Sequence, residues 1–380
     1  MNNFISALET KLILSQSNDF GIDNYDEFRF GKFGIPNHSQ SLNFKTLKRK
    51  IKRLIGYKKT QLLNSQFDGL KSVLTDLQNK YGENLQKFYE QLNSVDQELL
   101  IAIVAYRLIG YKKIKLPTNN KAYWESLILA NSLIDKNDTF DPNFMHFILE
   151  KCDLRKIGYD IQLYFSALGV TVDYILEQYA YKFEGKSVVA VEKGDVVLDI
   201  GACWGDTALY FACKTGNEGK VYPFEFIPEN IKLFNMNLAL NSDLQKQIEL
   251  IKHPVSNKSG DIIHYLDKGP CSRIEFVPFE GETGSTTTLS IDDFVIQNRI
   301  EKVDFIKMDI EGAENMALEG AIQTIRQFKP KLAIAIYHSM EDLVNIPNWI
   351  NDLNLGYKLY LGHYTIHAEE TVIFAKVENE

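Results

Sequence analysis

The chain has 380 residues, of which 45% are hydrophobic, a composition that suits a globular protein of about two domains with a buried core. Its net charge of -8 argues against a general nucleic-acid binder, since such a protein carries a basic excess. The longest apolar run, near residues 99–106, is shorter than the about 18 residues that span a bilayer. The four cysteines form no C-x-x-C pair, and the first residues lack the basic flank of a signal peptide. We therefore expect reduced thiols and a cytoplasmic protein.

Residues 1–155 show helical periodicity without a chemical motif, so we expect a mainly helical N-terminal region of unassigned role. Apolar residues at three- and four-residue steps predict helices over residues 62–77, 85–92, 99–109, 121–134 and 142–151. Gly82 separates the first two, and Ser94 to Gln97 form a capping box before the third.

Residues 45–59 contain many basic residues and no acidic one, with Leu47, Ile51 and Leu54 on one helical face. Such a basic amphipathic helix can lie on an anionic membrane, which would give a peripheral contact with the inner membrane surface. It can equally pack by its apolar side as a solvated helix, and we favour that second interpretation.

From residue 187 onward, strands alternate with helices, and we expect residues 156–380 to form a second domain. The predicted strands cover residues 196–200, 221–226, 248–251, 303–308, 332–337, 357–361 and 371–376. The predicted helices cover residues 206–214 and 229–240, a segment opened by residues 290–293, and residues 314–328. This alternation predicts an α/β fold with a parallel sheet covered on both faces, whose last strand runs antiparallel because its link is too short for a crossover helix.

Ligands of such sheets bind outside the carboxyl ends of the strands. The first strand ends in a turn where Gly201 and Gly205 let backbone approach a ligand, although the same glycines also suit a purely structural turn. Glu225 follows the second strand, where an acid suits the two ribose hydroxyls of a nucleoside. His253 to Ser256 follow the third strand and could frame an adenine ring.

Three acids meet at the end of the fourth strand, where Asp309, Glu311 and Glu314 surround Gly312. The helix dipole accounts for Glu314, but Asp309 and Glu311 need a cationic partner. The histidines expected to converge on this face with Glu369 and Glu370 are His338, His363 and His367. A single histidine is usually structural, but three of them beside acids favour a site.

Five segments together resemble the FkbM-type S-adenosylmethionine-dependent methyltransferases: VVLDIGACWGDTALYFA, KVYPFEFIPEN, TLSIDDF, VDFIKMDIEGAE and KLAIAIYH. The resemblance covers about residues 159–376. It implies a Rossmann-like class I methyltransferase sheet of seven strands with the last antiparallel. It also implies O-methylation of a hydroxyl on a sugar or natural product, and hence a role in carbohydrate modification such as polysaccharide biosynthesis.

The resemblance assigns the cofactor site residue by residue. Asp199, Gly201, Gly205 and Thr207 would surround the methionine end, Glu225 would hold the ribose, and Asp309 would lie near the sulfonium. Further predicted contacts to S-adenosylmethionine are Trp204, Asp206, Phe226, Val255 and Ser256. Pro223 departs from the expected pattern, because a proline is unusual in an inner strand.

Methyl transfer to a hydroxyl needs a base to remove its proton. We expect His338 to be that base, with His363 second and Glu311 as an orienting or alternative base. The predicted acceptor contacts are Arg273, His367 and Glu370. A divalent metal held by Asp309, Glu311 and a histidine is an alternative that we do not favour.

Two other classes of function stay open on the residues alone. One is a nicotinamide-dependent oxidoreductase, which the missing G-x-G-x-x-G and the antiparallel closing pair disfavour. The other is a protein that binds a carbohydrate or a protein partner on the same fold without catalysis. Neither alternative predicts nucleic acid as a ligand.

Overall fold

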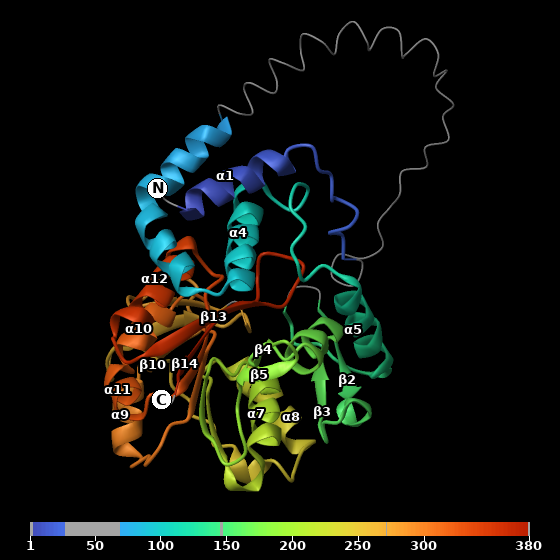
Figure 1. Ribbon diagram of the computed structural model, residues 1–380. Helices are drawn as coiled ribbons and strands as arrows, with labels where there is room; N and C mark the ends of the chain where they lie inside the picture. Colours follow the sequence, from blue (N-terminus) through green and yellow to red (C-terminus); the bar gives the residue numbers. More distant parts are fainter. Residues whose placement is uncertain (1–2, 27–68, 145–146, 271, 379–380) are drawn as a thin grey trace, which may run out of the picture.

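The centre of the molecule is a mixed sheet to which six strands of the described residues contribute (Figure 1). The structure is a computed structural model that describes residues 3–26, 69–144, 147–270 and 272–378. The strands are β6 (Val196–Ile200), β7 (Lys220–Phe224), β11 (Phe305–Met308), β12 (Lys331–Ala335), β13 (Tyr357–His363) and β14 (Thr371–Val377). They lie in the order β13-β14-β12-β11-β6-β7. β6, β7, β11 and β12 are parallel, and β14 is antiparallel to both of its neighbours, which confirms the predicted α/β fold.

Both faces of the sheet are buried. Along a strand the side chains alternate between faces, so Val197 and Phe305 join one hydrophobic cluster while Leu198 and Ile306 join the other. The helices that follow or connect the strands are α7 (Asp206–Thr215), α8 (Pro228–Ala239), α9 (Ile291–Gln297), α10 (Glu314–Glu319), α11 (Ile322–Phe328) and α12 (Met340–Asp352). Burial on two faces explains why these strands are continuous apolar runs in the sequence.

Two helices differ from the prediction. The helix expected over residues 314–328 is two helices, since the backbone leaves the helical path at Gly320 and Ala321. Helix α12 was not predicted, because Pro347 within it is a sequence signal against a helix. Its start is nevertheless capped by Ser339, whose hydroxyl accepts from the backbone N–H of Asp342 at 3.0 Å.

The third predicted strand, residues 248–251, is only bridged to the edge of the sheet. Two isolated parallel bridges join it to β7, Val221 with Ile248 and Phe224 with Ile251. The carbonyl of Pro223 accepts from the N–H of Ile251 at 2.8 Å, so residue 223 faces this segment. Proline has no N–H to return a bond, and the ladder is irregular for that reason. The expectation of seven regular strands was therefore wrong at this position.

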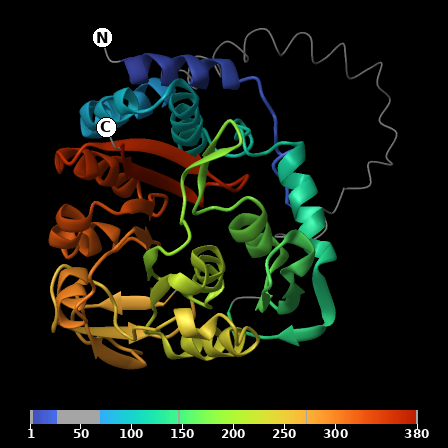
Figure 2. The ribbon, with the colours of Figure 1, turned by 60° about the horizontal axis from the view of Figure 1, so that its bottom comes forward.

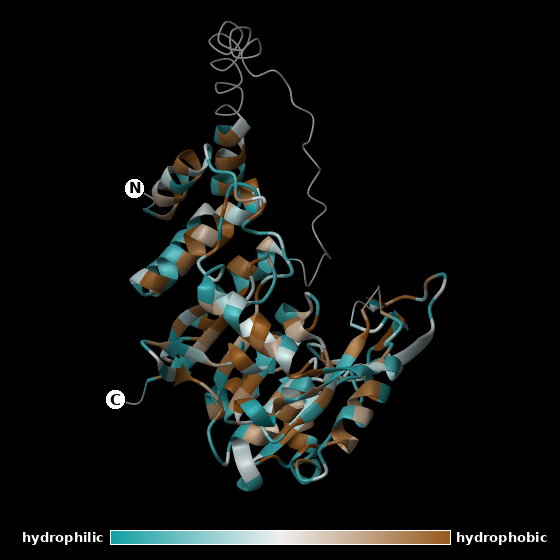
Figure 3. Ribbon diagram, turned by 90° about the vertical axis from the view of Figure 1, so that its right-hand side faces the viewer, coloured by the Kyte–Doolittle hydropathy of each residue, from teal (hydrophilic) through white to brown (hydrophobic). Residues whose placement is uncertain are grey.

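The N-terminal helices share hydrophobic clusters with the sheet, and the helix Ser94–Ile109 packs against β13. They are α1 (Asn3–Ser15), the helix of residues 69–91, α4 (Ser94–Ile109) and α5 (Lys121–Ser132). Figure 2 shows the first of these, in blue and cyan, beside the red strands β13 and β14, and Figure 3 shows them stacked over the sheet with apolar and hydrophilic residues alternating along them. Phe4, Phe88 and Leu100 belong to the same hydrophobic cluster as Leu359 of β13.

Two local predictions for these helices were wrong. Gly82 does not interrupt the helix, which runs unbroken from residue 69 to residue 91 because tertiary packing outweighs the weak helix propensity of glycine. Ser94 is not the cap of α4: the side chain of Asn93 accepts from the N–H groups of Val95 and Asp96. The helix therefore starts five residues before the expected 99–109.

The expected helix over residues 142–151 was also wrong. Strand β2 (Leu149–Asp153) lies there instead, between β1 (Ile134–Phe140) and β3 (Gln162–Phe165) in a small antiparallel sheet. The periodicity of a short apolar run cannot distinguish a helix from a strand. Here the segment is a strand because it pairs with both β1 and β3. The expected domain boundary at residue 155 falls inside this sheet.

Smaller elements complete the described chain. They are the helices Leu154–Ile157, Ala167–Gly169, Gly216–Glu218 and Gln245–Gln247, the π-helix η2 (Val170–Ile175), and the strands β4 (Tyr181–Phe183), β5 (Lys186–Val189), β8 (Ile262–Leu266), β9 (Arg273–Glu275) and β10 (Gly284–Thr287). The basic segment 45–59 lies outside the described residues. Among the helices that are described, none is long and apolar enough to cross a membrane.

Because the N-terminal helices share the core of the sheet, we predict that they unfold together with it. Phe88 is fully buried, so Phe88→Ala should lower the free energy of unfolding by about 3–5 kcal/mol. Denaturant unfolding followed by tryptophan fluorescence should show one shifted transition. Val73, which is 40% exposed, provides the control: Val73→Ala should change stability by less than about 0.5 kcal/mol. A second transition that keeps its wild-type midpoint would show two independent units.

Candidate active site

A cavity of about 340 Å³ lies at the carboxyl ends of β6, β7, β11 and β12. Of the predicted site residues, the structure brings to its wall Gly201, Trp204, Asp206, Thr207, Glu225, Phe226, Val255, Asp309, Glu311 and Glu370. The other predicted residues lie elsewhere: Asp199, Gly205, Ser256, Arg273, His338, His363 and His367.

The glycine turn after β6 brings backbone close to the cavity. Gly201 has a φ of +83°, and a Cβ at this position would lie 2.0 Å from the carbonyl oxygen of Asp309. Gly205 is the N-cap of α7 with a φ of +84° and gives no side-chain cap. The first residues of α7, Asp206 and Thr207, line the cavity with the positive end of that helix. The turn therefore requires glycine at both positions.

Asp199 lies behind the wall and binds a buried lysine. Its Oδ1 atom is 3.1 Å from Nζ of Lys307, and its Oδ2 atom accepts from the hydroxyl of Thr207 at 2.8 Å. Lys307 also donates to the carbonyl of Gly201 at 2.6 Å. Burial disfavours a charged lysine, but Asp199, Asp309 and Asp206 outweigh that cost and raise the pKa of Lys307. Asp199 therefore fixes the glycine turn, and its carboxylate is already occupied.

Glu225 is buried with its carboxylate held in place. Oε1 accepts from the backbone N–H groups of Phe226 at 2.7 Å and Ile227 at 2.8 Å. Oε2 accepts from the amide of Asn230 at 3.0 Å, and Asn230 in turn accepts from the indole of Trp204 at 3.2 Å. Burial raises the pKa of Glu225 to about 7, against these bonds. The oxygen Oε2 keeps acceptor capacity for a ligand hydroxyl.

One wall of the cavity beyond Glu225 is apolar. His253, Pro254 and Val255 line it, three of the four residues that we expect to frame an adenine ring. Ser256 is buried outside the wall, and its N–H donates to the carbonyl of Leu289.

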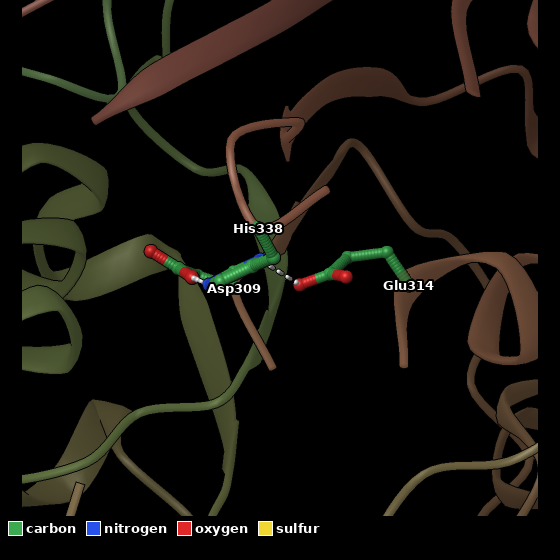
Figure 4. Close-up of side chains that lie close together, drawn as sticks. All are labelled: Asp309, Glu314 and His338. Carbon is green, nitrogen blue, oxygen red and sulfur yellow. Dashed lines mark ion pairs between the residues drawn. The ribbon is translucent and has the colours of Figure 1, made fainter. Parts of the chain in front are cut away.

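Asp309 is surrounded by hydrogen-bond donors. The hydroxyl of Tyr179 donates to Oδ2 at 3.0 Å, and the hydroxyl of Tyr337 lies 3.2 Å from both oxygens. Nε2 of His338 is 3.4 Å from Oδ1 (Figure 4). These contacts thus hold the side chain of Asp309 in a fixed orientation on the cavity wall.

His338 lies between carboxylates, and its predicted role as base does not fit this position. Nε2 faces Asp309, and Nδ1 lies 3.2 Å from Glu314 on the opposite side of the ring (Figure 4). Burial disfavours the imidazolium, but Glu314, Asp309 and Glu311 outweigh it and raise the pKa of His338 to about 9. The ring is therefore cationic at neutral pH, and it supplies the cationic partner that Asp309 and Glu311 needed.

The side chains around His338 also include the kinds of group that bind metal ions. Asp309, Glu314 and His338 each offer a ligand atom within 4.8 Å of the others. However, a metal-ligating imidazole must be neutral, and the neighbouring carboxylates raise the pKa of His338 and keep its ring protonated. The set fits a bridging imidazolium better than a metal.

Four more carboxyl groups line the cavity. Burial and the charge of Asp206 raise the pKa of Asp173 well above its usual range, so this pair shares a proton. Glu311 lies at the mouth with its side chain 55% exposed. Glu370 accepts from the amide of Gln178 at 2.5 Å, and burial together with Asp309 raises its pKa to about 8.

The structure does not bring the remaining predicted residues to the cavity. His363 is buried beside the hydroxyl of Thr371, 2.9 Å from Nδ1, and burial lowers its pKa to about 4. His367 faces Asp26 of the N-terminal region at 3.8 Å. Arg273 pairs with Glu275 on β9, and its side chain is 57% exposed.

Sequence reasoning missed several residues of the wall. Lys307 had a signal, since a lysine inside an apolar strand implies a buried ion pair. Three other residues of the wall lie before the strands of the sheet in the sequence: Asp173, Gln178 and Tyr179. No sequence pattern marks them as site residues, and only the structure shows that they line the cavity. Asp173 lies in the π-helix η2, an irregularity that is frequent at functional sites.

The N-terminal region also reaches the site. The guanidinium of Arg107, from α4, donates to the carbonyl of Tyr337 at 2.8 Å and to that of Ser339 at 3.1 Å. These carbonyls flank His338, so α4 holds the turn that presents the imidazolium to Asp309.

The Lys307–Asp199 pair should be essential for folding. Lys307→Met leaves a buried carboxylate without its counter-ion, so the free energy of unfolding should fall by about 3–5 kcal/mol in denaturant titrations. Lys302 pairs with Asp304 near the surface, with its side chain 54% exposed, so Lys302→Met should cost at most about 1 kcal/mol. Equal losses in the two variants would contradict this account.

Comparison with known protein families gives a match for one part of the chain. Residues 199–359 match the model of the methyltransferase FkbM domain. No curated protein gives a significant match.

Three solved structures are similar to the chain. Methyltransferase FkbM from Methylobacillus flagellatus KT is 18% identical over 76% of this chain and 70% of that one, with a TM-score of 0.41. A putative rRNA methylase from Clostridium thermocellum is 13% identical over 56% and 96%, with a TM-score of 0.35. An S-adenosylmethionine-dependent methyltransferase from Aquifex aeolicus is 16% identical over 63% and 100%, with a TM-score of 0.33.

The residues of the cavity fit the cofactor that this family uses. The buried carboxylate of Glu225 suits ribose hydroxyls, and the glycine turn after β6 brings backbone to the cavity wall at Gly201. Residues 199–359 of the chain therefore form an FkbM-type S-adenosylmethionine-dependent methyltransferase domain.

Proposed function

We propose that this methyltransferase methylates a hydroxyl group of an uncharged sugar or glycan, as a step of carbohydrate modification such as polysaccharide biosynthesis. The charge of the cavity wall carries the proposal. The carboxyl side chains on it are Asp173, Asp206, Glu225, Asp309, Glu311 and Glu370. Lys307 is the one lysine on the wall among the described residues, and Asp199 already binds it.

An acidic wall favours cationic and neutral ligands over phosphates. Bound S-adenosylmethionine supplies an activated methyl group on a cationic sulfonium. Glu225 would accept from its ribose hydroxyls, and Val255 with its neighbours would cover the adenine. The turn from Gly201 to Asp206 would take the methionine end, and Asp309 would face the sulfonium as a fixed anion.

The acceptor end of the cavity suits a sugar. Phe165 and Tyr179 give this part of the wall aromatic surface, and Glu311 and Glu370 add acceptors for hydroxyl groups. A ligand with apolar ring faces and many hydroxyl donors matches such a wall.

The same charge argues against one of the two other functions, the nicotinamide-dependent oxidoreductase. A nicotinamide dinucleotide carries a pyrophosphate, and the wall holds no uncompensated lysine or arginine among the described residues to bind it. Nucleic acid would meet the same repulsion. A protein that binds carbohydrate without catalysis would show no methyl transfer when labelled cofactor is supplied.

Acceptor charge provides the direct test of the proposal. Purified enzyme with methyl-labelled cofactor should label neutral oligosaccharides at least 10-fold faster than the same sugars carrying a phosphate, because like charges at the wall cost more than about 1.4 kcal/mol. Preference for the phosphorylated sugars would refute the proposal.

The cofactor contact of Glu225 makes a separate prediction. Glu225→Ala loses two charge-assisted bonds worth about 3 kcal/mol together, so calorimetry should show a roughly 100-fold weaker affinity for S-adenosylhomocysteine. Hydroxyl donors favour the carboxylate, so binding should release a proton from a group whose pKa is about 7. Wild-type affinity should therefore weaken as the pH falls from 8 to 6. Unchanged affinity in the variant would remove Glu225 from the site.

A further inference from the structure

We propose that Glu370 is the general base of the reaction and that the cofactor's positive charge controls its protonation. The base role rests on the proposed O-methylation. In the balanced step, the acceptor oxygen forms its bond to the methyl carbon while the S–C bond breaks and its electron pair returns to sulfur. The acceptor O–H bond breaks as well, and its proton moves to the carboxylate of Glu370.

The position of Glu370 suits this role. It lies on the cavity wall, in the short link that joins β13 to β14. Gln178 donates to Oε2, which leaves Oε1 without a donor among the described residues. The carboxyl therefore has one oxygen oriented by the protein and one available to a ligand hydroxyl.

The backbone conformation of Glu370 also supports a functional role for this residue. Its φ is +63°, a left-handed conformation that L side chains adopt at an energetic cost. The N–H of Tyr364 donates to the carbonyl of Glu370 at 3.0 Å and holds the turn. Glycine or asparagine would fit this backbone more easily, so strain is retained at a residue whose side chain reaches the cavity.

The other candidate bases on the wall are either engaged by neighbouring groups or exposed at the mouth of the cavity. Asp309 accepts from two tyrosine hydroxyls and faces His338, which is cationic. Asp173 shares a proton with Asp206, and Glu311 lies at the exposed mouth. Glu370 is the carboxyl that combines a place on the wall with an available oxygen.

The charges around Glu370 explain how the cofactor would control it. The ionisable groups that face it are Asp309, Glu369, Asp173, Tyr179, Tyr337 and His338. Burial and the carboxylates outweigh His338 and Gln178, and they raise the pKa of Glu370 to about 8. A group with that pKa is mostly protonated at neutral pH and needs a nearby cation to become a base. A bound sulfonium is such a cation, and its charge disappears when the methyl leaves, which then favours proton uptake.

Calorimetry tests this coupling without any acceptor. Binding of S-adenosylmethionine and of S-adenosylhomocysteine is measured at pH 7.5 in phosphate and in Tris, whose ionisation enthalpies differ. Wild-type enzyme should release roughly half a proton more with the cationic cofactor than with its neutral product. Both ligands would release the Glu225 proton alike, so the difference isolates a group that senses the sulfonium.

Glu370→Gln should abolish this difference, since glutamine has the shape of the neutral acid. Glu378→Gln is the matched control and should keep it, because this exposed residue at the end of β14 pairs with Lys358 and is not among the groups that face Glu370. With an acceptor present, turnover of Glu370→Gln should fall about 10²-fold or more while the affinity for S-adenosylhomocysteine stays within twofold.

Three results would overturn the proposal: equal proton release by the two ligands in wild-type enzyme, a difference that survives in Glu370→Gln, or full turnover in that variant. The wild-type measurement stands even if the variant does not fold. Failure of the calorimetric arm would leave the proposed sugar methylation intact, because that arm contains no acceptor.

Discussion

The site depends on one buried cation. Lys307 reaches from β11 to Asp199 on the neighbouring strand β6, and the two residues are directly paired in the sheet register. The same ammonium group donates to the carbonyl of Gly201, which has a backbone conformation that needs glycine. Without this positive charge, the carboxylates at the ends of β6 and β11 would repel one another in a medium that screens charge poorly. The lysine therefore permits an acidic cavity at this edge of the sheet.

A second cation organises the far side of that cavity. His338 follows β12 and lies between Asp309 and Glu314, which belong to the turn and helix after β11. Arg107 reaches over from α4 and binds the carbonyls on either side of this histidine. Tyr179 and Gln178 come from the segment just before the sheet, and they hold Asp309 and Glu370. Residues before position 199, where the family match begins, thus complete the site.

The sequence allowed a good prediction wherever burial on both faces forced a continuous apolar run, as in β6, β11 and β12. The sequence also predicted that Glu225 lies at the ligand-binding edge, because the carboxyl end of the second parallel strand must face that edge. It failed where a contact between distant segments decides the outcome. The periodicity of residues 142–151 could not reveal pairing with β1 and β3, and a histidine after β12 could not show that both of its nitrogens face carboxylates. The strongest signal left unused was Lys307, since a lysine within the apolar run FIKM must have a buried partner.

The central claim is that an acidic cavity pairs a cationic cofactor with an uncharged hydroxyl acceptor. The most direct measurement is to incubate the enzyme and methyl-¹³C-labelled cofactor with an extract of the cells that make this protein, and to identify the labelled atom by NMR. The account predicts the label on an oxygen of a neutral sugar unit. Label on nucleic acid, or on the nitrogen or carbon of a phosphorylated metabolite, would contradict it.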